Sequence, residues 1–178
     1  MIVPDDKDWT WVLERPCPEC GFDASTFARE RVAAAARANA RNWARLLEQA
    51  GVAVRTRVDC WSVLEYACHV RDVFRICDYR LERMLTEDGP HYANWDQDAT
   101  AIDDCYPEQD PRTVGDEVVA AADVIARRLE TVTGDAWQRT GFRSDGAAFT
   151  IDSFARYVIH DPVHHLWDVG ADPLGGQR

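Results

Sequence analysis

The chain has 178 residues, 46% of them hydrophobic and 10% aromatic, which is enough to bury the core of one domain. Its net charge of −11 disfavours binding to nucleic-acid phosphates or to anionic lipid surfaces. No run of about 20 apolar residues could span a bilayer, and the opening MIVPDDKDWTW shows no secretory signal. We therefore expect a cytoplasmic protein without nucleic-acid or membrane partners.

The first part of the chain predicts a leader and two helices. Residues 1–24 are expected to form an irregular leader that contains a Cys-x-x-Cys motif. An Ala-, Arg- and Leu-rich segment without Pro or Gly predicts a helix over 25–50, with Ser25 as its N-cap and Gly51 as its stop. Residues 59–86 predict a second helix, with Asp59 or Ser62 as its cap. Apolar residues recur there at alternating spacings of four and three: Val63, Ala67, Val70, Phe74, Cys77, Leu81 and Met84.

A long connection follows over residues 87–112, rich in Asp, Pro, Gly and Tyr, with a short helical turn expected at 98–105. Such loops often line functional sites. A third amphipathic helix is predicted over 111–133. After it, Asp145-Gly146 between aromatic residues predicts the turn of a short hairpin.

The last helix is predicted over residues 151–170, and residues 171–178 are expected to be a flexible tail. Four long amphipathic segments without a strong strand signal predict an all-α protein, a four-helix bundle over 25–170 with a short hairpin-like connection before the last helix.

Histidine is scarce, with five copies, yet three are clustered near the end of the chain. His160 and His164 are spaced i, i+4, which places them about 40° apart on one helix face. His69 lies beside the apolar stripe of the second helix. Three imidazoles from facing helices can hold one divalent metal ion and leave a position open for water or substrate, as catalytic sites do.

Two alternatives accompany this interpretation. His69 can instead be a hydrogen-bonded core residue. Pro162 lies between the paired histidines, so Asp161-Pro162 can begin a new helix, although the apolar phase on either side favours one kinked, continuous helix.

Acidic side chains are candidates for orienting the ligands. Glu65 and Asp72 flank His69 at −4 and +3, and Asp168 follows His164 by one turn. Each can accept the second N–H of a ligand imidazole, or can belong to a solvated acidic face. His165 is about 100° around the helix from His164, so we expect it in core packing or in a contact behind the ligands.

Cys17 and Cys20 have the spacing of half a zinc site, but no second Cys-x-x-Cys motif completes it. A structural or incidental role, a disulfide and a metal site all remain open for the pair.

The stretches WSVLEYACHVRD and YVIHDPVHHLWDV, together with the polar turn GFRSDGAAFT, resemble the DinB/YfiT family over about residues 25–170. The resemblance implies an up-down-down-up four-helix bundle, often a homodimer. It also implies a divalent metal, commonly zinc or nickel, held by His69, His160 and His164. Asp161 and Pro162 within the last motif depart from the usual pattern.

Some members of that family are S-transferases that use bacillithiol or mycothiol. We therefore expect a metal-dependent transferase that activates a low-molecular-weight thiol, mycothiol or a similar one, for attack on a small electrophilic substrate. The alternatives are an enzyme like mycothiol-dependent maleylpyruvate isomerase, a bundle that binds metal or a small ligand without turnover, and a metal-free bundle.

Overall fold

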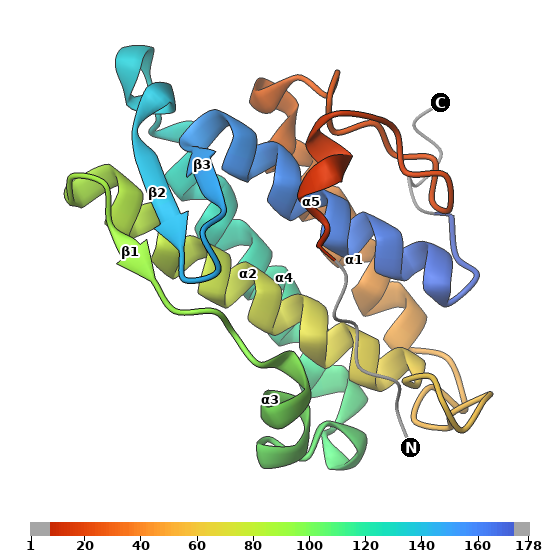
Figure 1. The fold of residues 1–178 in the computed structure, drawn as a ribbon. Coiled ribbons are helices and arrows are strands. Elements are labelled where there is room, and N and C mark those ends of the chain that lie inside the picture. The colour runs from red at the N-terminus through yellow and green to blue at the C-terminus, as the bar shows by residue number, and fades with distance from the viewer. Residues whose placement is uncertain (1–7, 173–178) are drawn as a thin grey trace.

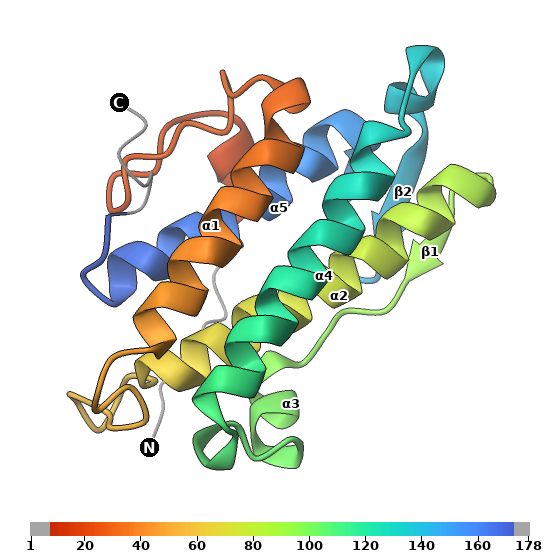
Figure 2. The ribbon, with the colours of Figure 1, turned by 180° about the vertical axis from the view of Figure 1, so that it is seen from behind.

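The computed structural model describes residues 8–172 and is built on four long helices (Figure 1). These are α1 (Val32–Leu47), α2 (Val63–Thr86), α4 (Pro111–Glu130) and α5 (Ile151–Asp168). Helices α2 and α4 run in one direction, and α1 and α5 run in the other (Figure 2), so the up-down-down-up bundle is confirmed. Within residues 8–172, no helix is long and apolar enough to cross a membrane.

The first two long helices begin later than the sequence predicted. Ser62 caps α2 through a capping box, in which the Glu65 N–H donates to Ser62 Oγ at 3.2 Å and the Ser62 N–H donates to Glu65 Oε2 at 2.8 Å. Ser25 does not cap α1, because it is held in a local turn where its N–H donates to Asp23 Oδ1 at 3.0 Å. A short 3₁₀ helix over Arg29–Arg31 then leads into α1.

Helix α5 continues through Pro162 without a break, as the apolar phase indicated. The Nδ2 group of Asn39, a buried residue of α1, donates to the Pro162 carbonyl at 2.9 Å. This bond ties α5 to α1 in the segment that carries the histidines.

A small three-stranded sheet covers one end of the bundle. Strands β2 (Thr140–Arg143) and β3 (Ala148–Thr150) form the predicted hairpin, and β1 (His91–Tyr92), which was not predicted, pairs in parallel with β2. The connection from β1 to α4 contains the short helix α3 (Gln97–Asp103), close to the turn expected there.

The segment before α1 packs along α5 and contributes to the core. It contains a 3₁₀ helix over Thr10–Leu13, and the side chains of Val12, Cys17 and Phe22 are buried. Arg156 of α5 donates to the carbonyls of Ala24 and Ser25 at 3.2 and 3.1 Å. The N-terminal segment, residues 8–31, thus brings its cysteines against the helix that carries the paired histidines.

Candidate metal-binding site

A cleft of about 710 Å³ opens between α2, α5, the segment around Trp95 and the N-terminal segment. Its lining contains Arg80 and Arg143, and more numerous carboxylates: Asp8, Glu19, Asp59, Asp96, Asp98, Asp145, Asp161 and Asp168. Such an excess of negative charge raises the local concentration of cations.

Three possible metal ligands converge beside this cleft: Asp161 and His165 of α5, which line it, and His69 of α2, which is buried next to them. Asp161 Oδ1 lies 3.5 Å from His69 Nε2 and 3.7 Å from His165 Nε2. Two N or O ligands bound tetrahedrally at about 2.0–2.2 Å are separated by about 3.3–3.6 Å. The first distance lies within this range and the second is slightly longer, so the donor atoms are close to the spacing that one small divalent cation would impose.

The polar atoms at the centre of this cluster lack hydrogen-bond partners. His69 is 1% exposed, and neither of its ring nitrogens is hydrogen-bonded. Asp161 Oδ1 is also buried without a hydrogen bond. Each such atom costs about 1–3 kcal/mol, so a cation that meets both His69 Nε2 and Asp161 Oδ1 removes a penalty from the fold. The residues present thus fit a metal ion.

The contacts of the flanking groups also suit metal binding. His165 Nδ1 donates to Asp168 Oδ2 at 2.7 Å, which leaves Nε2 directed toward Asp161. Burial opposes the ionisation of Asp161, but the nearby imidazoles of His165 and His69 lower its pKa below the ordinary value. Asp161 is therefore an anion at neutral pH.

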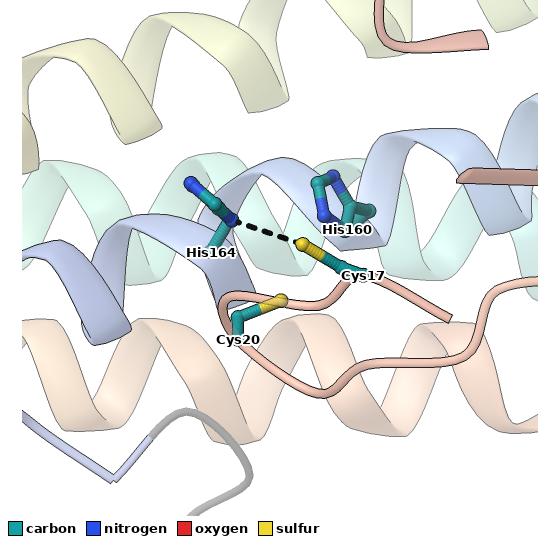
Figure 3. A group of neighbouring side chains, drawn as sticks. All are labelled: Cys17, Cys20, His160 and His164. Atoms are coloured by element: carbon teal, nitrogen blue, oxygen red, sulfur yellow. Dashed lines mark hydrogen bonds between the residues drawn. The ribbon is translucent and has the colours of Figure 1, made fainter. Parts of the chain in front are cut away.

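His160 and His164 lie in a second cluster, with Cys17 and Cys20, in which all four side chains are buried. The two imidazoles also border the cleft, whereas the two cysteines do not. Figure 3 shows the thiols of the N-terminal segment beside the two imidazoles of α5. Cys17 Sγ is 3.6 Å from His164 Nδ1. His164 Nε2 faces Glu19 Oε2 at 3.4 Å and Asp168 Oδ1 at 3.8 Å.

Burial governs the protonation of this second cluster. It lowers the pKa of His160 to about 4 and is the main cause of the lowered pKa of His164, so both imidazoles are neutral near pH 7. It also raises the pKa of the Cys20 thiol to about 12. Neutral imidazoles have the free lone pair that a metal requires.

The three predicted histidine ligands are thus divided between two clusters. His69 lies with Asp161 and His165, whereas His160 and His164 lie with the cysteines. One residue along a helix is a rotation of about 100°, so residues 160 and 164 turn toward the N-terminal segment while 161 and 165 turn toward α2. The three-histidine ligand set remains a prediction, and the distances favour His69, Asp161 and His165.

The acidic candidates have different surroundings. The Glu65 carboxylate accepts from Arg55 Nε at 2.9 Å as well as capping α2, and Asp72 accepts from Arg71 Nη2 at 2.8 Å and from the Tyr106 hydroxyl at 2.6 Å. Both carboxylates are therefore bonded to side chains other than the imidazole of His69. Asp168 does contact an imidazole, that of His165. The sequence analysis did not propose Asp161 as a ligand. The signal that could have identified it is its i, i+4 spacing to His165, which equals the spacing of His160 to His164.

Comparison with known proteins relates the fold to a family. YfiT from Bacillus subtilis, described as "a probable metal-dependent hydrolase with an unusual four-helix bundle topology", superposes with a TM-score of 0.63 at 18% identity. The alignment covers 93% of this chain and 88% of that one. No curated protein matches the sequence. The model of the DinB superfamily matches residues 10–169, and the chain belongs to that superfamily.

Proposed function

We propose that this protein is a metal-dependent enzyme whose divalent cation, zinc or nickel, is held by His69, Asp161 and His165. The observation that supports this most directly is the 3.5 and 3.7 Å spacing of their donor atoms beside a cleft of about 710 Å³ that Asp161 and His165 line. Three protein ligands leave at least one coordination position open, which is the pattern of catalytic sites. The cleft is large enough for a small-molecule substrate.

A cation held by these residues would lower the pKa of a coordinated water or thiol and would so supply a nucleophile near neutral pH. The protein orients the site. Asp168 fixes the ring of His165, and the ring of Trp95 stacks on His69 with centroids 5.3 Å apart and an interplanar angle of 8°. Trp61 contacts the same imidazole at 5.3 Å. These aromatic rings shield His69 from water.

We propose a low-molecular-weight thiol such as mycothiol as the nucleophile and a small electrophile as its target, because some members of the DinB/YfiT family, which the sequence resembles, are thiol S-transferases. In this reaction the thiol sulfur bonds to the electrophilic carbon, the bond from that carbon to its leaving group breaks, and the thiol proton is released. Hydrolysis, in which water takes the place of the thiol, is the rival reaction, since the structural neighbour YfiT is described as a hydrolase.

Arg80 gives a further indication of the substrate. It lines the cleft, and its Nη2 donates to the Ala93 carbonyl at 2.9 Å. Among residues 8–172 no carboxylate forms an ion pair with it, whereas Arg143 is paired with Asp145 at 2.7 Å. A guanidinium with donors to spare in a substrate-sized cleft favours a substrate with a carboxylate or a similar anionic group.

The test is an activity assay on protein purified without a histidine tag and loaded with zinc or nickel. Thiol consumption with a model electrophile, and ester hydrolysis without thiol, distinguish the two nucleophiles. We expect His69→Ala to abolish the thiol reaction and the exposed His91→Ala to retain it. Equal rates in wild type and His69→Ala would refute the proposal, and metal uptake without turnover would favour a binding protein.

We also propose, from the family resemblance alone, that the protein is a homodimer. Sedimentation equilibrium measures the assembly directly, and a mass equal to one chain would contradict it.

A further inference from the structure

We propose that Cys17, Cys20, His160 and His164 form a second metal site, one that holds a structural zinc ion and fastens the N-terminal segment to α5. This site shares no ligand with His69, Asp161 and His165, and it stands whether or not the protein is an enzyme.

The four donors are close enough together to meet at one ion. Each residue offers one ligand atom, and these atoms all lie within 4.8 Å of one another. A Zn–S bond of about 2.3 Å and a Zn–N bond of about 2.0–2.1 Å at the tetrahedral angle separate sulfur and nitrogen by about 3.6 Å. Cys17 Sγ and His164 Nδ1 are 3.6 Å apart, so this pair already has the separation that a shared zinc ion imposes.

The backbone of the N-terminal segment presents both thiols to the same side. The Cys17 N–H donates to the Phe22 carbonyl and the Gly21 N–H donates to the Cys17 carbonyl, both at 2.9 Å. Gly21 has φ +73°, in the left-handed region that favours glycine. This tight turn brings the two cysteines against one face of α5, where His160 and His164 are one turn apart (Figure 3).

The burial of the cluster independently points to a ligand. His160 is 4% exposed, yet its Nε2 has no hydrogen-bond partner. Cys17 and Cys20 are 1% and 7% exposed. A divalent cation with two thiolates and two neutral imidazoles has no net charge, so the complete site can be buried without an uncompensated ion.

The ligand set determines the kind of metal and its role. Two thiolates with two imidazoles form the soft, tetrahedral donor set typical of zinc. Four protein ligands leave no position for substrate, so the ion has a structural role. It fixes the rotation of α5, and thereby directs Asp161 and His165, each one residue after a zinc ligand, toward His69.

Cobalt substitution of untagged, reduced protein tests this site, because Co²⁺ bound to thiolate gives charge-transfer absorption in the near ultraviolet that cobalt bound to N and O ligands lacks. We expect this absorption in the wild type, and we expect Cys17→Ser/Cys20→Ser to lose it together with one zinc per chain by elemental analysis. Cys60→Ser/Cys105→Ser, which also removes two thiols, should retain both. His69→Ala should leave the absorption unchanged, which separates this site from the one formed by His69, Asp161 and His165.

A second variant keeps the test informative if the double serine variant does not fold. His160→Cys preserves four ligands and adds a thiolate, so its charge-transfer absorption should exceed that of the wild type at equal zinc content. Wild-type protein without cobalt–thiolate absorption would overturn the proposal. So would a Cys17–Cys20 disulfide found by mass spectrometry in protein prepared under reducing conditions.

Discussion

His160 and Asp161 are consecutive residues of α5, yet they belong to different clusters. Asp161 Oδ1 lies 3.5 Å from His69 Nε2 on α2, whereas His160 lies with the two cysteines of the N-terminal segment. The same one-residue step separates His164 from His165. Helix α5 therefore presents two i, i+4 pairs of ligands, rotated by about 100° from each other, to two different neighbours.

Asp161→Asn tests the anionic ligand of the cleft. Asparagine keeps the shape of the side chain and loses its charge. We expect the affinity of the cleft for zinc to fall by more than about 100-fold, because even loss of a group behind a ligand costs about 10–100-fold. Competition with a chromophoric chelator measures the affinity, and the exposed Asp88→Asn is the matched control. An affinity equal to that of the wild type would exclude Asp161 as a ligand.

Asp168→Asn tests the group that orients His165. The Asp168 carboxylate accepts from His165 Nδ1 at 2.7 Å, so we expect its loss to weaken zinc binding in the cleft by about 10–100-fold. The same chelator competition applies. Asp168 Oδ1 also lies 3.8 Å from His164 Nε2, so the cobalt–thiolate absorption of the second site is recorded in parallel. If only the site of Cys17 and Cys20 lost zinc affinity, Asp168 would not be the group that orients His165.

Arg80→Gln tests the anionic substrate. A hydrogen bond to a charged group contributes about 1.5–3 kcal/mol, so we expect KM to rise about 10-fold or more while kcat changes less. The exposed Arg112→Gln removes the same charge away from the cleft and should leave both constants unchanged. Equal KM values for wild type and Arg80→Gln with a carboxylate-bearing electrophile would contradict this assignment.

Asp72→Ala tests a structural network. Asp72 is bonded to Arg71, which is 3% exposed, and to Tyr106. Removing the carboxylate leaves Arg71 Nε and Nη2 and the Tyr106 hydroxyl without their acceptor, while Arg71 Nη1 keeps its ion pair with Glu117 at 2.9 Å. We therefore expect the free energy of unfolding to fall by about 3 kcal/mol. Asp123→Ala, which breaks surface ion pairs with Arg37 and Arg127, should cost about 1 kcal/mol or less. Urea denaturation measures both, and equal losses would contradict the network.

The same residue predicts a pH dependence. Burial opposes ionisation of Asp72, but hydrogen bonds from Arg71 and Tyr106 lower its pKa below the ordinary value of 3.8. A lowered pKa in the folded state adds stability that is complete above the unfolded pKa and is lost as the pH falls through the folded pKa. Below about pH 4, the wild type should therefore lose stability faster than Asp72→Asn does. Parallel pH profiles would contradict this assignment.

The sequence predicted the four long helices because their apolar stripes report burial directly, as the stripe from Val63 to Met84 does for α2. Strand β1 was missed because two residues, His91 and Tyr92, show no periodicity, and their pairing depends on a distant hairpin. Ser25 was a plausible cap for α1, but it is held in a local turn and the helix begins later. Of the two caps that the sequence offered for α2, Asp59 and Ser62, the structure uses Ser62.

The histidines were identified, but not their grouping. An i, i+4 spacing fits both 160/164 and 161/165, and only the rotation of α5 against its neighbours decides which pair faces α2. Cys17 and His164 are 147 residues apart, so no local pattern reports their contact. The sequence did contain both halves of the four-ligand set, a Cys-x-x-Cys and an HxxxH motif, which become one candidate site only when the N-terminal segment is placed along α5.

The most direct test of two ligand-bearing faces on α5 is a crystal structure of zinc-loaded protein with anomalous diffraction recorded at the zinc absorption edge. We predict two separate peaks in the anomalous difference map, one bounded by His69, Asp161 and His165 and the other by Cys17, Cys20, His160 and His164. A single peak coordinated by His69, His160 and His164 together would contradict the account.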